Sequence, residues 1–279
     1  MKNKKYYTLI TGASQGIGKA FALECAERGM NLFLVALPDR NLDVIKKSIT
    51  EKYSVDVVTF GIDLTNPGAS REVYEFSLEN LIQVNFLINN AGFGTSGLFE
   101  KSNNDTNFKM IMLNVQAQVS LTRYFIGDLK NNAPSHILNV SSMEATLPLP
   151  YKTVYTGTKS FIYSFSLALR EELRHSGIGV SVVCPGSVVT NEEGLKRIQS
   201  HGTRAKMIVK MPDYIARKTI PAVLKGQVEI IPGFLPRLFV KLGKGFPTLI
   251  KMRILEKIFR VYRDHESEEI KPEIFSTGS

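Results

Sequence analysis

Two tyrosines and two lysines stand close together in the segment 150–161, PYKTVYTGTKSF. A tyrosine hydroxyl can protonate a carbonyl oxygen, but its usual pKa of about 10 makes it a poor acid at neutral pH. Lys159 follows Tyr155 by four residues, and residues four apart share one face of a helix. Because an ammonium group favours the phenolate, it lowers the pKa of a neighbouring tyrosine. We therefore predict that Tyr155 is a proton donor activated by Lys159.

Tyr151 is the competing proton donor. No lysine follows it by four residues, and the adjacent Lys152 would point to another side of a helix. The preceding run 147–150, LPLP, favours a loop over a helix. We therefore assign the proton to Tyr155 and interpret Tyr151 as a wall of the substrate pocket, with simple packing as the alternative.

A glycine-rich turn near the N-terminus predicts a phosphate site. Gly12, Gly16 and Gly18 follow an apolar strand-like run and precede a helical segment that begins near Ile17. Glycines allow a tight turn and a close approach of the backbone to a pyrophosphate, and the helix N-terminus supplies unpaired N–H groups. Ser14 could cap the helix through its hydroxyl. The combination of strand, turn and helix indicates dinucleotide binding.

The end of the second predicted strand bears on which dinucleotide binds. NAD-binding proteins of this type place an acidic residue there, for the adenosine ribose, but this sequence has Ala36. Arg40 and Lys19 are the candidates for contact with a 2′-phosphate, and Asp39 could oppose that phosphate. The sequence thus favours NADP(H) and leaves NAD(H) open.

Short apolar runs alternate with segments of helical periodicity along most of the chain. The predicted strands are 7–10, 32–36, 55–61, 86–89, 136–140, 179–183 and 228–231. The predicted helices are 17–28, 42–52, 70–83, 106–130, 154–176 and 212–225. Nearly continuous apolar strands are typical of a parallel sheet covered on both faces. We therefore predict an α/β fold with a doubly wound parallel sheet.

Composition narrows the classes of function. The chain has 279 residues, 43% of them apolar, which is ordinary for a globular protein. Its formal net charge of +9 should attract phosphorylated cofactors or anionic lipids. Motifs for nucleic-acid recognition and for metal ligation are lacking, so we expect that the protein binds neither nucleic acid nor a metal ion. Cys25 and Cys184 are interpreted as free thiols, and the lack of a long apolar run predicts a cytoplasmic protein.

Several motifs in order make the chain resemble the short-chain dehydrogenase/reductase family, in the branch with TGxxxGxG and YxxxK. They are TGASQGIG at 11–18, IDL at 62–64, NNAG at 89–92, LNV at 113–115, NVSS at 139–142, YTGTK at 155–159 and PGSVVT at 185–190. The resemblance covers roughly 6–233 and implies a Rossmann-type fold.

The resemblance also implies four catalytic residues. It places the substrate-binding serine thirteen residues before the tyrosine, which selects Ser142 over Ser141. It implies that Asn114 holds a water that links Lys159 to solvent, and that Lys159 also binds the nicotinamide ribose. Tyr155 keeps the role of general acid and base.

The resemblance extends to the cofactor and the substrate. Asp63 would contact adenine, and the loop 185–190 would cradle the nicotinamide. The implied cofactor residues are Gly12, Ser14, Gln15, Gly16, Ile17, Gly18, Asp63, Leu64, Asn90, Ala91, Gly92, Tyr155, Lys159, Pro185, Gly186, Val188 and Thr190. The candidate pocket residues are Phe93, Met143, Leu149 and Tyr151. This mostly apolar set suits a fatty-acyl, steroid-like or xenobiotic carbonyl or alcohol.

The C-terminal part differs from the rest. We divide the chain into a catalytic domain, 1–233, and an extension, 234–279, whose basic amphipathic part, 234–263, is followed by an acidic frayed tail. The extension is expected to pack on the body, lie in a subunit interface or contact an anionic membrane. We expect a homodimer or homotetramer paired through 106–130 and 154–176.

Our leading hypothesis is a carbonyl reductase or alcohol dehydrogenase that uses NADP(H). The alternatives are a non-catalytic dinucleotide sensor and a membrane-associated lipid-binding protein on the same fold. Retention of both Tyr155 and Lys159 argues against the sensor. An isomerase or dehydratase on a related scaffold is disfavoured, because those larger relatives tend to carry GxxGxxG, whereas this chain carries GxxxGxG.

Overall fold

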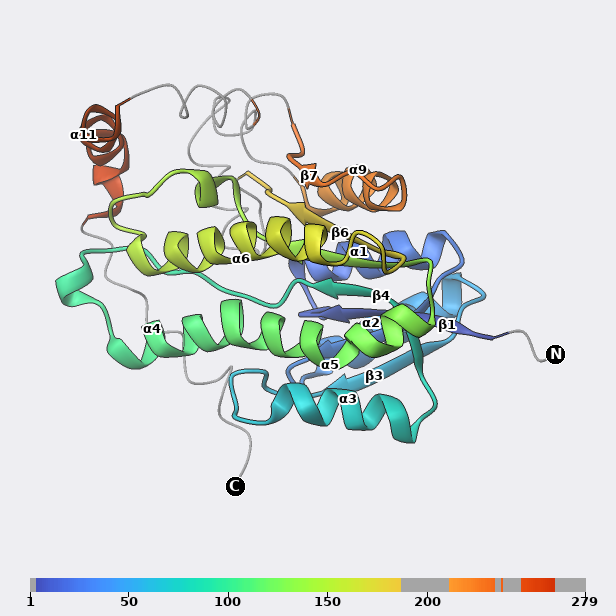
Figure 1. The fold of residues 1–279 in the computed structure, drawn as a ribbon. Coiled ribbons are helices and arrows are strands. Elements are labelled where there is room, and N and C mark those ends of the chain that lie inside the picture. Colours follow the sequence, from blue (N-terminus) through green and yellow to red (C-terminus); the bar gives the residue numbers. More distant parts are fainter. Residues whose placement is uncertain (1–3, 187–210, 234–236, 238–246, 264–279) are drawn as a thin grey trace.

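A seven-stranded, fully parallel sheet forms the centre of the computed structural model, which describes residues 4–186, 211–233, 237 and 247–263 (Figure 1). The strands are β1 (Tyr6–Thr11), β2 (Asn31–Ala36), β3 (Val57–Gly61), β4 (Gln83–Asn89), β5 (Ser135–Val140), β6 (Ile178–Val183) and β7 (Glu229–Ile230). Their order is β3-β2-β1-β4-β5-β6-β7. The predicted doubly wound α/β fold is confirmed.

Helices cover both faces of this sheet. They are α1 (Gly16–Glu27), α2 (Arg40–Lys52), α3 (Ala69–Glu79), α4 (Asn104–Ile111), α5 (Gln118–Asn131), α6 (Thr153–Glu172), α9 (Pro212–Leu224) and α11 (Thr248–Phe259). Apolar side chains of α1, α2 and α9 pack on one face, and those of α3, α5 and α6 pack on the other. Strands that are buried on both faces explain the nearly continuous apolar runs in the sequence.

The strand order reverses between β1 and β4. After β1 the chain builds β2 and β3 outward on one side, and it then returns to place β4 on the other side of β1. In folds of this type, ligands bind outside the carboxyl ends of the strands at such a reversal. The glycine turn follows β1, and the NNAG motif ends β4.

Two predicted helices differ from the structure. The helix predicted over 70–83 ends at Glu79, because Leu81 adopts a positive φ of 54° and Gln83 already belongs to β4. The helix predicted over 106–130 is interrupted by a π-helical turn, Met112–Ala117, between α4 and α5. Such turns are rare and occur frequently at functional sites.

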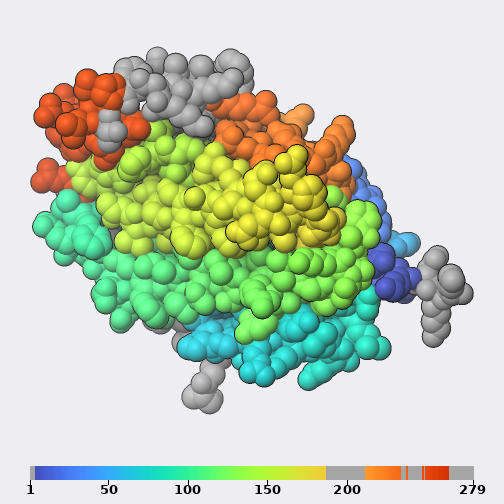
Figure 2. Space-filling model, viewed as in Figure 1, coloured from blue at the N-terminus to red at the C-terminus, as the bar shows by residue number. Residues whose placement is uncertain are grey.

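The described part of the C-terminal extension packs on the body of the protein. Leu255 of α11 is buried against Leu147 and Leu149, with Met252 and Phe259 beside them. Helix α11 lies at one corner of the molecule (Figure 2). None of the described helices combines the length and the apolar character needed to cross a membrane.

Candidate active site

Tyr155 and Lys159 lie one turn apart on α6, as their spacing predicts. The Lys159 ammonium lies 5.9 Å from the centre of the Tyr155 ring and donates a hydrogen bond to the carbonyl oxygen of Val140 at 3.0 Å. Burial lowers the pKa of Lys159 to about 8, because the charged form loses its hydration. Lys159 is therefore a cation near neutral pH that loses its charge in mildly alkaline solution.

The pKa of Tyr155 is raised above its usual value, whereas we predicted that Lys159 would lower it. Burial is the main cause, since the phenolate is poorly hydrated, and the charge of Glu144 adds to the increase. Ser142 acts in the opposite direction through its interaction with the phenol. The nicotinamide of an oxidised dinucleotide would add a positive charge that also favours the phenolate.

The two serines at the end of β5 have different partners. The Ser141 hydroxyl donates to the carbonyl oxygen of Lys159 at 2.7 Å, so it fixes the backbone of α6. The Ser142 hydroxyl oxygen accepts from the backbone N–H of Glu144 at 3.1 Å and interacts with Tyr155. Of the two serine hydroxyls, that of Ser142 is the one that interacts with the Tyr155 phenol, and its role beside the reacting oxygen stays a prediction.

Asn114 lies fully buried in the π-helical turn. Its amide nitrogen donates to the carbonyl oxygen of Phe93 at 2.9 Å and to the Thr158 hydroxyl at 3.0 Å, and its amide oxygen accepts from the Phe93 N–H at 3.0 Å. Asn114 thus ties the segment after β4 to α6, directly beside Tyr155. Thr158 was not among the predicted site residues, although it lies within the YTGTK motif.

The glycine turn has the shape that a pyrophosphate requires. Gly12 has a φ of 64°, and a Cβ there would lie 3.0 Å from the Cα of Ala91. A Cβ on Gly18 would overlap the Gly12 carbonyl. The N-cap residue of α1 is Gln15 and not Ser14, and the Gln15 side chain makes no capping hydrogen bond, so Ser14 does not have the capping role that we considered. The uncapped N–H groups and the space kept open by glycine fit a dinucleotide phosphate.

The NNAG motif braces this turn from β4. The Asn90 side chain donates to the carbonyl oxygens of Thr11, at 2.9 Å, and Gly12, at 3.3 Å. The Thr11 hydroxyl accepts from the backbone N–H groups of Asn90 and Ala91. Thr11 is a contributor that sequence analysis missed, although it opens the TGASQGIG motif.

Two acidic residues near the predicted adenosine end have partners inside the protein. One carboxylate oxygen of Asp63 accepts from the Thr65 hydroxyl at 2.8 Å and from its N–H at 2.9 Å. The Asp39 carboxylate caps α2 by accepting from the N–H groups of Asn41 and Leu42. Asp39 is thus occupied by helix capping.

The four candidate pocket residues are distributed around the catalytic group. Phe93 is held by Asn114, and Met143 packs with the cluster around Cys184. Leu149 is buried under α11, and the Tyr151 hydroxyl donates to Glu256 of α11 at 2.7 Å. The carbonyl oxygen of Pro185 accepts from the N–H of Met143 at 2.9 Å, which ties the start of the 185–190 loop to the segment after Ser142. Val188 and Thr190 lie outside the described residues.

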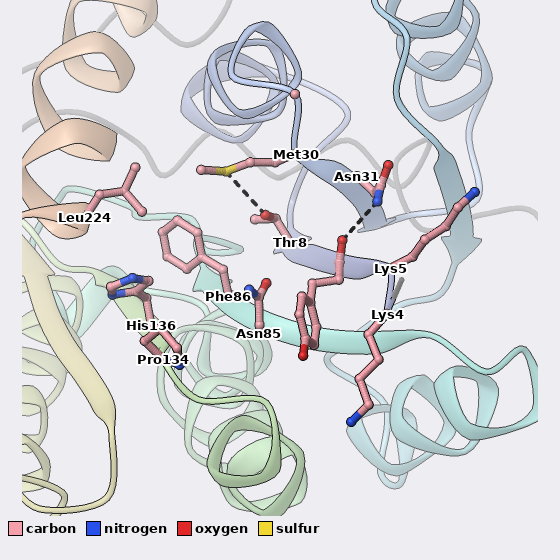
Figure 3. A pocket seen from close by; sticks show the side chains of 12 residues that line it. Lys4, Lys5, Thr8, Met30, Asn31, Asn85, Phe86, Pro134, His136 and Leu224 are labelled. Carbon is pink, nitrogen blue, oxygen red and sulfur yellow. Dashed lines mark hydrogen bonds between the residues drawn. The ribbon is translucent and has the colours of Figure 1, made fainter. Parts of the chain in front are cut away.

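One pocket lies far from these groups. It opens at the amino ends of β1, β4 and β5, between Lys4, Met30 and His136 (Figure 3). The predicted catalytic and glycine-turn residues all lie at the carboxyl ends of the strands, so they are absent from its lining. We therefore do not interpret it as the reaction site.

Comparison with known proteins agrees with this geometry. The family model for short chain dehydrogenases matches residues 7–199. The chain belongs to the short chain dehydrogenase family. It is similar to the very-long-chain 3-oxoacyl-CoA reductases of Macaca fascicularis, with 31% identity over 95% of this chain and 83% of that protein, and of Mus musculus, with 28% identity over 90% and 82%. The chain is accordingly an oxidoreductase acting on a carbonyl or alcohol group.

Solved structures resemble the whole fold. A 7β-hydroxysteroid dehydrogenase superposes with a TM-score of 0.82, at 24% identity, over 90% of this chain and 96% of that one. A short-chain dehydrogenase from Sphingobium yanoikuyae in complex with NADPH has a TM-score of 0.73 at 26% identity, over 95% and 99%. The likeness supports a nicotinamide dinucleotide as the cofactor of this family member.

Proposed function

We propose that this protein reduces the keto group of a long-chain 3-oxoacyl thioester, or a similarly apolar ketone, with NADPH. The observation that carries the proposal is the proximity of Tyr155, Ser142 and Lys159, with the apolar Leu147 and Leu149 in the segment that joins Ser142 to Tyr155. The basic character of the chain suits a substrate that carries phosphates. The names of the relatives with 28–31% identity point to the same substrate class.

In the proposed mechanism, four side chains handle the proton and position the substrate. The bound dinucleotide supplies the hydride. Ser142 donates a hydrogen bond to the substrate oxygen, and Tyr155 gives that oxygen its proton. Lys159 stabilises the phenolate that Tyr155 leaves behind and binds the nicotinamide ribose. Asn114 acts as a positioning residue through Phe93 and Thr158, and it holds the water that links Lys159 to solvent.

The proposed cofactor residues are those of the glycine turn, Asp63–Leu64, Asn90–Gly92 and the loop 185–190. NADP(H) is favoured because Ala36 at the end of β2 is apolar and buried, so no carboxylate stands there for a ribose hydroxyl. Arg40 and Lys19 are exposed and available for a 2′-phosphate.

A substrate and cofactor panel tests the proposal. The panel contains 3-oxoacyl thioesters of increasing chain length, steroid ketones and aromatic ketones, each with NADPH and with NADH. We expect kcat/KM to rise with acyl chain length and to be at least about tenfold higher with NADPH. A clear preference for NADH would contradict the cofactor assignment, and no turnover with any member would favour the sensor alternative.

We further propose that the protein is cytoplasmic and dimeric or tetrameric, with 1–233 as the catalytic domain and 234–279 as an extension. The helices α4, α5 and α6 expose Phe108, Ile111, Tyr124 and Phe161, which suits burial in a subunit interface. Sedimentation of wild-type protein and of Phe161→Glu tests this: we expect dissociation of the variant. A monomeric wild-type protein would contradict it.

A further inference from the structure

The outer face of α11 carries a row of exposed apolar side chains. Ile250, Ile254 and Ile258 follow one another at intervals of four residues and are 52%, 47% and 57% exposed. Val261, in the turn after the helix, continues the row and is 71% exposed. Residues with this spacing share one side of a helix. We call these four residues the apolar row.

A basic row runs beside the apolar row. Arg253, Lys257 and Arg260 occupy the adjacent side of α11 and the following turn, and all three are exposed. Glu256 is the only acid among residues 247–263, and its carboxylate accepts hydrogen bonds from Tyr151 and Arg260. The outward surface of this helix is therefore apolar and cationic, which complements the acyl chains and anionic headgroups of a lipid surface.

The inner face of α11 is anchored to the active-site segment. Leu255 packs on Leu147 and Leu149, and the Glu256–Tyr151 hydrogen bond lies beside this contact. The anchored residues belong to the stretch between Ser142 and Tyr155, so the helix lies against the catalytic loop. Its position at a corner of the molecule leaves the opposite face to the outside (Figure 2).

We propose that the apolar and basic rows of α11 dock this protein on an anionic lipid surface, next to the loop that joins Ser142 to Tyr155. The docked helix brings the catalytic loop to the membrane, so that an apolar substrate dissolved in the lipid reaches the site without crossing water. Lipid docking does not depend on the reaction, whereas the supply of substrate from lipid rests on the proposed function.

Co-sedimentation with vesicles tests the docking. The probe is a vesicle of phosphatidylcholine with phosphatidylserine, compared with phosphatidylcholine alone. We expect the wild-type protein to bind the anionic vesicles in a salt-sensitive way, and Ile254→Asp/Ile258→Asp to reduce the partition coefficient at least about tenfold. The matched control is Val44→Asp/Leu78→Asp, which changes two similarly exposed apolar residues on α2 and α3. This control should bind like the wild type.

A second pair of variants separates specific docking from general charge. Arg253→Gln/Lys257→Gln removes two cations from the basic row, and Arg217→Gln/Lys218→Gln removes two exposed cations from α9. Only the first should weaken binding by several-fold. Thermal unfolding and dinucleotide binding should be unchanged in every variant, which verifies that each one folds.

Three outcomes would overturn the proposal. They are no vesicle binding by the wild-type protein, equal binding by the Ile254→Asp/Ile258→Asp variant, and dissociation of an oligomer by that variant without loss of vesicle binding. The last would assign the apolar row to a second copy of this chain. A separate kinetic measurement tests the supply of substrate from the lipid. Vesicles should lower the KM for a long-chain substrate in the wild-type enzyme and not in the Ile254→Asp/Ile258→Asp variant. Vesicle binding without this effect on KM would support the docking of α11 on lipid but contradict the supply of substrate from the membrane.

Discussion

Gly94 lies against the ring of Tyr155 so closely that a Cβ at position 94 would overlap that ring, with the Cε2 atom only 2.8 Å away. A side chain here must displace the phenol that transfers the proton. We expect Gly94→Ala to lower kcat about 10- to 100-fold, because small misplacements of a catalytic group are costly. Steady-state kinetics with NADPH measures this effect.

Gly157 provides the control for Gly94, since it lies on α6 only two residues after Tyr155. Apart from the backbone of its own helix and its chain neighbours, a Cβ on Gly157 would meet no atom of the described residues within 4 Å. Gly157→Ala should keep full activity and raise the melting temperature slightly, because alanine favours the helix. Equal loss of activity in the two variants would contradict the role of Gly94.

The two tyrosines of the 150–161 segment should respond differently to loss of the hydroxyl. Tyr155→Phe should lower kcat by about 10²- to 10⁴-fold, since the general acid is gone, while dinucleotide binding and the melting temperature are retained. Tyr151→Phe removes only the hydrogen bond to Glu256 and should keep kcat within about threefold. An active Tyr155→Phe enzyme together with an inactive Tyr151→Phe enzyme would reverse the assignment.

The sequence predicted the strands and the placement of Tyr155 beside Lys159 correctly where local periodicity and a motif indicated the same secondary-structure element. The strands follow from apolar runs that are buried on both faces, and the Tyr155–Lys159 pair follows from helical spacing. The choice between Ser141 and Ser142 rested on a family interval and stays a prediction, to which the structure adds the different partners of the two hydroxyls. The Ser141 hydroxyl is already engaged with the backbone of Lys159.

The remaining features of the site depend on contacts between distant segments, which no local pattern encodes. The ring of Tyr155 meets Gly94, and the amide of Asn114 joins Phe93 to Thr158, in both cases across tens of residues. Tyr151 was interpreted as a pocket wall, but its hydroxyl partner lies on α11, 105 residues away. Helical periodicity likewise predicted one continuous helix where a π-helical turn places Asn114.

Asn114 should matter for stability as well as for rate. Asn114→Leu leaves the N–H and carbonyl of the half-buried Phe93 without their partner, so we expect the free energy of unfolding to fall by about 2–4 kcal/mol. We also expect a lower kcat. Thr158→Val removes one of the three hydrogen bonds of Asn114, together with the bond from the Thr158 hydroxyl to the Tyr155 carbonyl oxygen, and should cost about 1–2 kcal/mol. Urea unfolding measures both, and an equal cost in the two variants would reject the bridging role.

The ion pair between Glu144 and Lys152 should tune the acidity of Tyr155. The Lys152 ammonium donates to one Glu144 oxygen at 2.9 Å, and the other oxygen is buried without a hydrogen-bond partner among the described residues. The charge of Glu144 raises the pKa of Tyr155, so its removal lowers that pKa. In alcohol oxidation the phenolate is the active form, and activity rises as pH passes through this pKa. Glu144→Gln should therefore move the rising limb to lower pH, by roughly half to one unit.

Lys152→Met gives the opposite test of the same pair. Loss of the ammonium leaves the Glu144 carboxylate uncompensated near the phenol, so the pKa of Tyr155 rises and the limb moves to higher pH. The measurement is kcat/KM for oxidation from pH 7 to 12, a range that extends to alkaline pH because the pKa of Tyr155 is raised. Shifts of the same sign in both variants would show that the pair acts through packing, because only the electrostatic effect reverses when the carboxylate rather than the ammonium is removed.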